Sequence, residues 1–575
     1  MAANLPPRRL VATGSVTWAR PAMDYAPASK AEQLWMHLNS HGEHWLVRSD
    51  IAHVLPIPLA EYLQNGRTDT VQAVKETPYR SVYRLHLAED RWYVKLYRPT
   101  RWLHCLRAFL GCDPAHHEFV TALRLENRGV PVPPALAWGR LPDGTTLIVS
   151  AALNPAETLA DLLRKRAASE TDAAAPFRNR IIEQTARLVA RLHDLGLCHH
   201  DLHADNLLIW YSPEGAQVVL LDFREVKRRT MNTCRTRANL ALLGQSVALL
   251  THKTERRRFL EAYRHHRRTL SIARTDVFRW ARAIERAMRK GCVRYWRRAN
   301  KRYISPSRRV YRLQLGHWHL WAASTLPRSV AHACLQIAQN GQLFPSCRLI
   351  KSSASGTTAE VQMPGWHKPV IVKSFGRGKS FWSRLGRRYQ SLARRAWLAG
   401  WQLLEAQLPT AKPLALIERR SWLGVSASFL VLEKLEDAVT LREYAEQMNE
   451  KHLLRQLGCS IARLLRLAHE RGFSHPDLKA SNILVQYRSA GPRIFFVDVT
   501  HVRLGCLSLA RRARDLARLY VSFRGDRRLG RADWLRFLFT YLGTHKPAWK
   551  ALWRRIHTLA ARKVQRNLRR NRPLS

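Results

Sequence analysis

The sequence predicts an α+β fold of two bilobal units in tandem, each with a small antiparallel-sheet lobe and a larger helical lobe. The first observation is a motif that occurs twice, as HHDLHADN at residues 199–206 and as HPDLKASN at residues 475–482. The second is an apolar run ending in aspartate after each copy, VVLLD at 218–222 and IFFVD at 494–498. The matching aspartates and asparagines all lie 276 residues apart, which indicates a duplication.

Length and composition agree with two folded domains. A chain of 575 residues exceeds what one hydrophobic core usually organises, and 46% apolar residues is ordinary for a globular protein. The prolines near the start predict irregular chain before a helix at residues 30–38. The expected parts are an N-terminal extension at 1–65, a first domain at 66–290, a basic helical linker at 291–340, and a second domain at 341–575 that ends in a basic helix.

The charge balance predicts an anionic partner. The formal net charge is +53, from 96 Lys and Arg against 43 Asp and Glu. Such a charge favours a membrane face, a phosphorylated glycolipid or nucleic acid, without choosing among them. The nine cysteines contain no C-x-x-C pair, so neither a zinc site nor a disulfide framework is indicated. We find no apolar run near the roughly 18–20 residues of a membrane span and no signal-peptide pattern, so we expect a cytoplasmic protein.

In the first copy, the elements before the motif predict a paired lysine and glutamate. Residues 79–97 have the pattern of two paired strands, with Lys95 on the second. Residues 116–127 carry Glu118 and have helical spacing that ends at a glycine and a proline cluster. A carboxylate beside the lysine would hold its ammonium group against the α and β phosphates of a nucleotide. The strand expected at 146–151 would form the hinge to the helical lobe.

The motif itself supplies the other groups that phosphoryl transfer needs. Asp201 is expected to orient or deprotonate an acceptor hydroxyl, Asn206 to bind magnesium, and Asp222 to hold the metal that bridges the phosphates. Taken singly, a His-x-Asp-Leu sequence can be a turn and an aspartate after a strand can cap a helix. The whole ordered set predicts a protein-kinase-like domain that uses ATP and Mg²⁺.

The second copy departs from the first at the glutamate. Lys373 lies in the predicted strand 369–375, but the spacing that separates Lys95 from Glu118 leads to Ala396. Glu405 lies about 13 Å further along the same predicted helix, so it is not expected to substitute.

The second copy nevertheless retains its motif residues. Asp477, Asn482 and Asp498 are present, and Lys479 could contact the transferring phosphate. Catalytic, weakened and regulatory roles all stay open for this copy, and a noncatalytic scaffold is the alternative.

Neither copy has the full pattern of an ordinary protein kinase. Residues 77–83 and 352–358 stand where a G-x-G-x-x-G loop would precede the lysine strand. The metal-binding aspartate is followed by Phe-Arg in one copy and Val-Thr in the other, so the D-F-G glycine is missing. An ordinary protein kinase is therefore disfavoured.

These residues resemble the lipopolysaccharide kinase (Kdo/WaaP) family, which phosphorylates Kdo or heptose in the core of bacterial lipopolysaccharide. The resemblance covers most of both halves and extends to residues 118–133, 394–410 and 511–519. It implies a kinase-like fold, ATP and Mg²⁺, a lipopolysaccharide sugar hydroxyl as acceptor, and work at the cytoplasmic face of the inner membrane. The candidate residues are Asp201 and Asp477 as catalytic groups, Lys95, Glu118, Lys373 and Lys479 at the nucleotide, and Asn206, Asp222, Asn482 and Asp498 at the metal and nucleotide.

The placement of charge fits an anionic glycolipid partner. Residues 294–312 contain eight Lys or Arg and no acid, and no Asp or Glu follows Asp533. Apolar residues recur at helical spacing over 553–568, with basic residues between them. This pattern fits a helix that lies on anionic lipid, or equally a last lobe helix with a solvated basic face.

Three rival functions stay open. A small-molecule or protein Ser/Thr kinase would keep the same residues and label a soluble acceptor. A kinase and pseudokinase pair would turn over only in the first copy, or in neither. A nucleic-acid binder would need only the basic surface, but no recognised binding module accompanies it.

Overall fold

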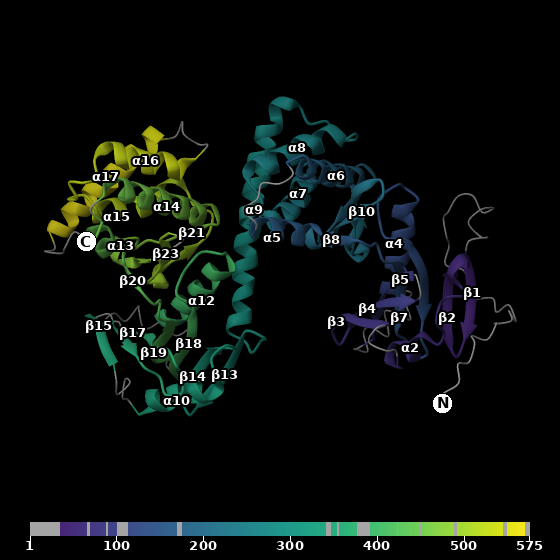
Figure 1. The fold of residues 1–575 in the computed structure, drawn as a ribbon, viewed down its shortest axis with the longest axis horizontal. Coiled ribbons are helices and arrows are strands. Elements are labelled where there is room, and N and C mark those ends of the chain that lie inside the picture. The colour runs from purple at the N-terminus through teal and green to yellow at the C-terminus, as the bar shows by residue number, and fades with distance from the viewer. Residues whose placement is uncertain are drawn as a thin grey trace. The chain divides into compact units, whose positions relative to one another are not determined.

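The computed structural model describes most of the chain. The described residues are 35–65, 70–87, 90–99, 113–168, 175–340, 347–353, 356–375, 391–422, 424–448, 450–487, 491–543 and 549–569. The chain divides into two compact units, Met1–Met288 and Arg289–Ser575. Each unit consists of a sheet lobe and a helical lobe (Figure 1).

The sheet lobe of the first unit is a seven-stranded antiparallel sheet. Its strands in spatial order are β1 (Trp35–Ser40), β2 (Glu43–Arg48), β6 (Ala135–Arg140), β7 (Thr146–Ala151), β5 (Asp90–Tyr97), β4 (Arg80–Leu87) and β3 (Val71–Glu76). Along β5, Trp92, Val94 and Leu96 are buried in one apolar core. Because side chains alternate along a strand, Lys95 and Tyr97 share the other face of the sheet.

The helical lobe of the first unit follows that sheet. Its elements are β8 (Ala156–Thr158), α5 (Leu159–Ala168), α6 (Ala175–Asp194), β9 (Leu197–His199), β10 (Leu207–Ser212), β11 (Gly215–Leu220), β12 (Val226–Arg228), α7 (Thr233–Val247) and α8 (Lys253–His266). A separate helix, α4 (Pro114–Glu126), packs on β6 and β7 and joins the core of the helical lobe. Helix α2 (Leu59–Asn65) contributes Leu59 to the sheet core, and α9 (Val277–Ala299) begins in this unit and ends in the next.

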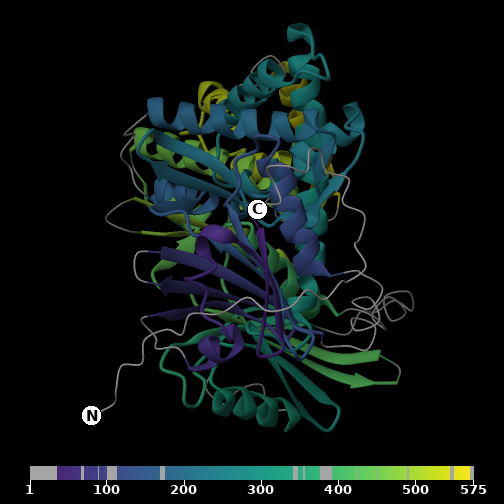
Figure 2. The same cartoon turned by 90° about the vertical axis from the view of Figure 1, so that its right-hand side faces the viewer.

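The second unit repeats this sheet with the same strand order. Its strands are β13 (Val310–Leu315), β14 (Trp318–Ala323), β18 (Pro413–Ser421), β19 (Gly424–Glu433), β17 (Val370–Phe375), β16 (Gly356–Val361) and β15 (Cys347–Ser353). Helix α10 (Arg328–Gln339) packs on one face through Val330 and Leu335, at the bottom of Figure 2. Helix α12 (Leu392–Glu405) takes the place that α4 has in the first unit.

The second helical lobe also repeats the first and adds helices at its end. Its elements are β20 (Ala438–Thr440), α13 (Leu441–Glu446), α14 (Lys451–Glu470), β21 (Phe473–Ser474), β22 (Ile483–Gln486), β23 (Arg493–Phe496), β24 (Arg503–Leu504), α15 (Leu509–Ser522), α16 (Arg531–Leu542) and α17 (Trp549–Leu568). Two copies of one strand order confirm the predicted α+β fold of two tandem bilobal units.

Two parts of the expected domain layout are wrong. The supposed linker at 291–340 contains β13, β14 and α10, which belong to the second unit's sheet lobe. In β13, polar residues such as Arg312 alternate with apolar ones, so the high charge hid a strand pattern. The supposed extension at 1–65 supplies β1 and β2 to the first sheet, and the helix expected at 30–38 is β1 from Trp35 onward. Residues 30–34 lie outside the described residues.

Helix α17 uses its apolar face inside the protein. Leu552, Ile556 and Ala560 are buried in the core of the second helical lobe, and α17 packs against α15. The arginines of its other face are exposed: Arg554, Arg555, Arg562 and Arg566. The lobe-helix interpretation therefore accounts for the apolar residues, which are not free to enter lipid. In the described part of the chain, we find no helix with the length and apolar character to cross a bilayer.

Candidate active site

The predicted lysine and glutamate meet in the first unit. Lys95 Nζ donates to Glu118 Oε1 at 2.5 Å, and Tyr97 Oη donates to Glu118 Oε2 at 2.5 Å. The Glu118 side chain is 1% exposed, so both oxygens of a buried carboxylate have partners. Burial, reinforced by the Glu118 charge, raises the pKa of Tyr97 above its ordinary value, so its hydroxyl stays protonated as a donor. The glutamate lies one turn into α4, which Asp113 caps by accepting from Ala115 N.

The loop after β9 presents Asp201 to solvent. Its side chain is 57% exposed, and His203 Nε2 lies 3.3 Å from Asp201 Oδ2. Asn206 Nδ2 donates to the Asp201 carbonyl oxygen at 2.9 Å, which fixes the amide oxygen of Asn206 away from the loop backbone. Leu221 N donates to the Asn206 carbonyl oxygen at 2.9 Å, so the loop is joined to the residue that precedes Asp222.

A buried network of hydrogen bonds supports the loop that carries Asp201. Asn239 Nδ2 donates to the His199 carbonyl oxygen at 2.7 Å, and its side-chain oxygen accepts from His193 Nε2 at 2.9 Å. His193 Nδ1 is then left to accept from Tyr263 Oη at 2.8 Å. Burial lowers the pKa of His193 to about 4, so the ring is neutral near pH 7. The network holds the backbone that carries Asp201 without a buried charge.

Asp222 follows β11 in a left-handed backbone conformation with φ of 56°. Arg80 Nη1 lies 3.4 Å from Asp222 Oδ2, while Asp222 Oδ1 is buried and has no hydrogen-bond partner among the described residues. Burial by itself would raise the pKa of Asp222, but the nearby Lys95 and Arg80 cations outweigh it and hold that pKa below its ordinary value. The carboxylate is therefore ionised, with one oxygen available to a ligand.

These residues fit a magnesium ion bound together with nucleotide phosphates. Mg²⁺ is usually held by one or two protein carboxylates plus phosphate and water oxygens. Asp222 Oδ1 and the Asn206 amide oxygen can serve as such ligands. Within the described ranges, no three His, Cys, Asp or Glu side chains gather to hold a metal by themselves. We call Lys95, Glu118, Asp201, Asn206 and Asp222 the first site.

In the second unit, the lysine has a different partner. Ala396 is buried at the place in α12 that Glu118 has in α4, five residues after the capping Ser391. Lys373 Nζ instead lies 3.4 Å from Asp498 Oδ1. Glu405 is bonded to Tyr303 and Arg309, which confirms that it does not replace the missing glutamate.

The second motif is also restrained differently. Arg518 Nη1 donates to Asp477 Oδ1 at 2.9 Å, and Asn482 Nδ2 donates to Asp477 Oδ2 at 3.1 Å. The residue 276 positions before Arg518 is Leu242, so the first copy has no such arginine. Lys479 lies in the same loop, just before the helical turn Ala480–Asn482. We call Lys373, Asp477, Lys479, Asn482 and Asp498 the second site.

The supporting network is conserved in form between the two units. His469 Nδ1 bonds to Tyr541 Oη at 2.7 Å, and Asp515 Oδ2 accepts from His469 Nε2 at 3.2 Å and from Ser474 Oγ at 2.7 Å. Asp515 stands where the first unit has Asn239, again 276 residues apart. The spacing of 276 also relates His193 to His469, so it is a sequence signal for these two positions of the network, whereas the tyrosines lie 278 residues apart. No spacing rule could have identified Arg80 or Arg518, since their partners lie on other elements.

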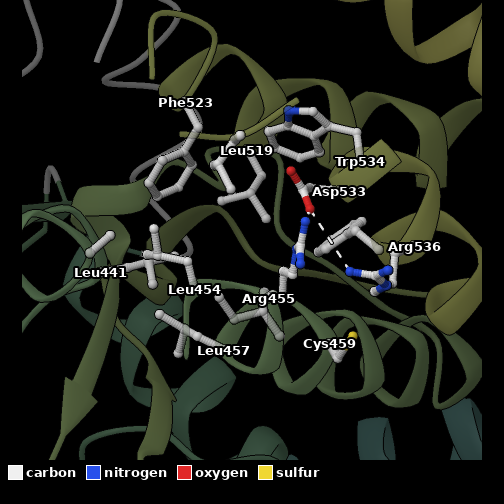
Figure 3. Close-up of a pocket in the computed structure, with 15 residues that line it drawn as sticks. Leu441, Leu454, Arg455, Leu457, Cys459, Leu519, Phe523, Asp533, Trp534 and Arg536 are labelled. Atoms are coloured by element: carbon white, nitrogen blue, oxygen red, sulfur yellow. Dashed lines mark hydrogen bonds and ion pairs between the residues drawn. The ribbon is translucent and has the colours of Figure 1, made fainter. Parts of the chain in front are cut away.

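An apolar cavity of about 60 Å³ lies elsewhere, in the helical lobe of the second unit. Figure 3 shows Leu441, Leu454 and Phe523 lining it, with Arg455 and Arg536 turned toward Asp533 at one edge. Arg455 Nε donates to Asp533 Oδ1 at 2.7 Å. None of the residues of either site lines this cavity.

Comparison with known proteins adds independent information. The model of the lipopolysaccharide kinase (Kdo/WaaP) family matches residues 65–263 and 366–541, one region in each unit. A 3-deoxy-D-manno-octulosonic acid kinase of Haemophilus influenzae is 31% identical over 153 residues, which are 25% of this chain and 61% of that relative. One of Xanthomonas campestris is 34% identical over 129 residues, 22% of this chain and 49% of that relative.

The solved structures include WaaP in complex with acyl carrier protein. That chain is 25% identical, and the match covers 37% of this chain and 89% of WaaP with a TM-score of 0.29. The chain spans about half to three-fifths of the curated relatives it matches. The family model, in contrast, matches well over half of this chain, in both units. The chain therefore belongs to the lipopolysaccharide kinase (Kdo/WaaP) family.

Proposed function

We propose that this protein is an ATP-dependent kinase that phosphorylates a sugar hydroxyl of the lipopolysaccharide core, either Kdo or heptose, or of a similar lipid-linked saccharide. The observation that carries the proposal is the first site. It combines a strand lysine paired with a helix glutamate, an exposed aspartate, an asparagine bonded to the backbone of that aspartate, and a second aspartate with one oxygen that has no partner among the described residues. The matched relatives bear the name of a Kdo kinase, which supports a sugar acid of this class as acceptor.

In this proposal each residue of the first site has one task. Lys95, held by Glu118, binds the α and β phosphates of ATP. Asp201 accepts the proton of the acceptor hydroxyl, or orients that hydroxyl for in-line attack on the γ phosphorus. Asn206 and Asp222 hold Mg²⁺, which when bound neutralises charge on the phosphates.

A second candidate assigns catalysis to the first copy alone, so that the chain is a kinase and pseudokinase pair. Two observations favour it: Ala396 leaves Lys373 without a glutamate, and Arg518 engages Asp477. If the chain is a kinase and pseudokinase pair, the second site has at most a nucleotide-binding role, through Lys373, Lys479, Asn482 and Asp498. If both copies were catalytic, Asp477 would have the role in the second copy that Asp201 has in the first.

The charge distribution supports an anionic lipid-linked acceptor. The net charge is +53, and the exposed face of α17 carries arginines without any acid. Since the apolar face of α17 is buried, contact with a membrane would be electrostatic and peripheral. Arginines would also recognise acceptor phosphates and carboxylates by bidentate hydrogen bonds. We place the enzyme at the cytoplasmic face of the bacterial inner membrane.

Transfer of labelled γ-phosphate from Mg-ATP tests the proposal. The acceptor is lipid extracted from cells that lack the protein, and the readout is label in lipopolysaccharide. Label that is lost with Asp201→Asn supports the first copy as the catalyst, and loss only in the double variant with Asp477→Asn supports both copies. Folded wild-type protein that labels a soluble acceptor, or binds nucleic acid without transfer, contradicts the lipid-kinase proposal.

A further inference from the structure

The turn between β3 and β4 of the first unit has few backbone amides to offer a phosphate. Thr77 N donates to the Arg80 carbonyl oxygen at 2.9 Å, and Arg80 N donates to Thr77 Oγ1 at 2.9 Å. Pro78 has no amide hydrogen. A glycine-rich loop covers nucleotide phosphates in protein kinases, and exposed backbone N–H groups are natural phosphate ligands. In this turn the amides of Thr77 and Arg80 are already used, so neither is available to a phosphate.

Arg80 stands at the right place to be that donor. It is the first residue of β4 and pairs with Tyr97, two positions from the pair of Val82 with Lys95. Side chains two apart on a strand share a face, so Arg80 lies on the same face as Lys95. Its guanidinium carbon is 5.5 Å from the centre of the Tyr97 ring, and its Nη1 reaches Asp222. One arginine thus connects the sheet lobe to the metal-binding aspartate of the helical lobe.

Two atoms of this ion pair lack hydrogen-bond partners. Arg80 Nε and Asp222 Oδ1 are both buried, and neither has a partner among the described residues. Buried polar atoms in folded proteins nearly always have a partner, so two such atoms in one ion pair call for an explanation, and a bound ligand supplies one. A donor calls for an anionic oxygen and a carboxylate oxygen calls for a cation. A magnesium-bound triphosphate supplies both in one ligand.

We propose that Arg80 is a phosphate-binding residue of the first site. When Mg-ATP enters, Arg80 leaves Asp222 to the metal and donates to oxygens of the β and γ phosphates, in place of the backbone of a glycine-rich loop. The inference rests on the proposed function only in taking ATP as the phosphoryl donor, and it is independent of the acceptor.

The second site cannot use the same device. Thr358 pairs with Lys373 as Val82 pairs with Lys95, which puts Gly356 at the position of Arg80. Gly356 has φ of +143°, and a Cβ there would lie 2.0 Å from the Ser374 carbonyl oxygen. An arginine at this position is sterically excluded, so the device belongs to the first copy alone.

The test compares the affinities for Mg-ATP and for AMP by calorimetry on the full chain. All proteins carry Lys373→Met and Asp498→Asn, so that binding reports the first site. Arg80→Met is expected to weaken Mg-ATP binding about 10- to 100-fold, the usual effect of lost hydrogen bonds to a charged group. AMP affinity is expected to change less than about twofold, because AMP lacks the β and γ phosphates.

Arg84→Met is the matched control. Arg84 lies on the same strand, about 13 Å away, and donates to Tyr93 Oη at 2.6 Å, so its replacement should leave both affinities unchanged. Arg80→Lys keeps a charge without the bidentate fork and is expected to be intermediate for Mg-ATP alone. If Arg80→Met does not fold, the comparison is made with Arg80→Lys instead.

Three results would overturn the inference: wild-type Mg-ATP affinity in Arg80→Met, equal losses for Mg-ATP and AMP, or equal losses in Arg84→Met. The proposed function fails separately. A protein that binds Mg-ATP through Arg80 but labels no lipid upholds the inference and refutes the lipid acceptor. A parent protein that binds no Mg-ATP refutes both.

Discussion

Replacing Glu118 with glutamine tests whether the buried ion pair organises the first site. The substitution keeps the shape of the side chain but removes the charge that Lys95 faces at 2.5 Å. It also leaves one acceptor oxygen for two donors, Lys95 Nζ and Tyr97 Oη. The lysine then loses the group that fixes its ammonium for the phosphates.

The magnitude follows from the burial of the pair. Breaking a fully buried pair costs about 3–5 kcal/mol, and Lys95 is 19% exposed, so we expect the first unit to lose about 2–3 kcal/mol of unfolding free energy. For a unit of this size that lowers its unfolding temperature by about 4–12 °C. Loss of a charge-assisted contact to ATP should lower kcat/KM about 10- to 150-fold, measured well below the unfolding temperature.

Glu405→Gln provides the matched control. Glu405 is also a carboxylate shared by an arginine and a tyrosine, but it lies in the second unit and outside both sites. Its replacement should destabilise the second unit and leave phosphoryl transfer by the first site unchanged. Wild-type transfer in Glu118→Gln, or an equal loss of transfer in Glu405→Gln, would refute the reasoning.

Three further predictions concern pH, the second site and the membrane. The pKa of His193 is about 4 in the folded state and about 6.5 in the unfolded state, so the unfolded state binds more protons between these two pH values. The first unit should therefore lose stability as the pH falls from about 6.5 to 4. In urea titrations, His193→Gln should reduce this dependence of stability on pH. Arg518→Leu should change the unfolding free energy of the second unit by less than about 1 kcal/mol, because both side chains of the pair with Asp477 are about a third exposed. The same substitution should not restore phosphoryl transfer to an Asp201→Asn protein. Restored transfer would show that the second copy is catalytic. Binding to anionic vesicles, measured by sedimentation, should fall steeply as the salt concentration rises. Substitution of Arg555, Arg562 and Arg566 by glutamate should weaken the same binding. Binding that does not depend on salt would contradict an electrostatic contact.

The sequence predicts the parts of the site that local pattern controls. Lys95 and Glu118 can be predicted because each lies in an element whose apolar residues recur at the spacing of a strand or a helix. The duplication of the chain repeats the motif and so makes it easier to recognise. Ala396 was found for the same reason, through the spacing that it breaks.

Local sequence patterns could not predict contacts between elements that are far apart in the sequence. Arg80 and Asp222 are 142 residues apart, and Arg518 and Asp477 are 41 apart, so only the folded chain brings each pair together. The strands β13 and β14 were missed for another reason. The residues before β13 are rich in arginine and Arg312 stands at an exposed position of β13, so the high charge obscures the alternation of polar and apolar residues.

Phosphoryl transfer to lipopolysaccharide by Asp201→Asn and Asp477→Asn proteins tests the central claim most directly. The structure leaves Asp201 exposed in the unit that has a complete lysine and glutamate pair, whereas Asp477 is bound by Arg518 in the unit whose lysine lacks its glutamate. We predict that Asp201→Asn lowers transfer at least about 100-fold, the scale of a lost catalytic base, and that Asp477→Asn lowers it less than about twofold. Undiminished transfer by folded Asp201→Asn protein, or equal losses in the two variants, would contradict the claim that the first site is the catalytic one.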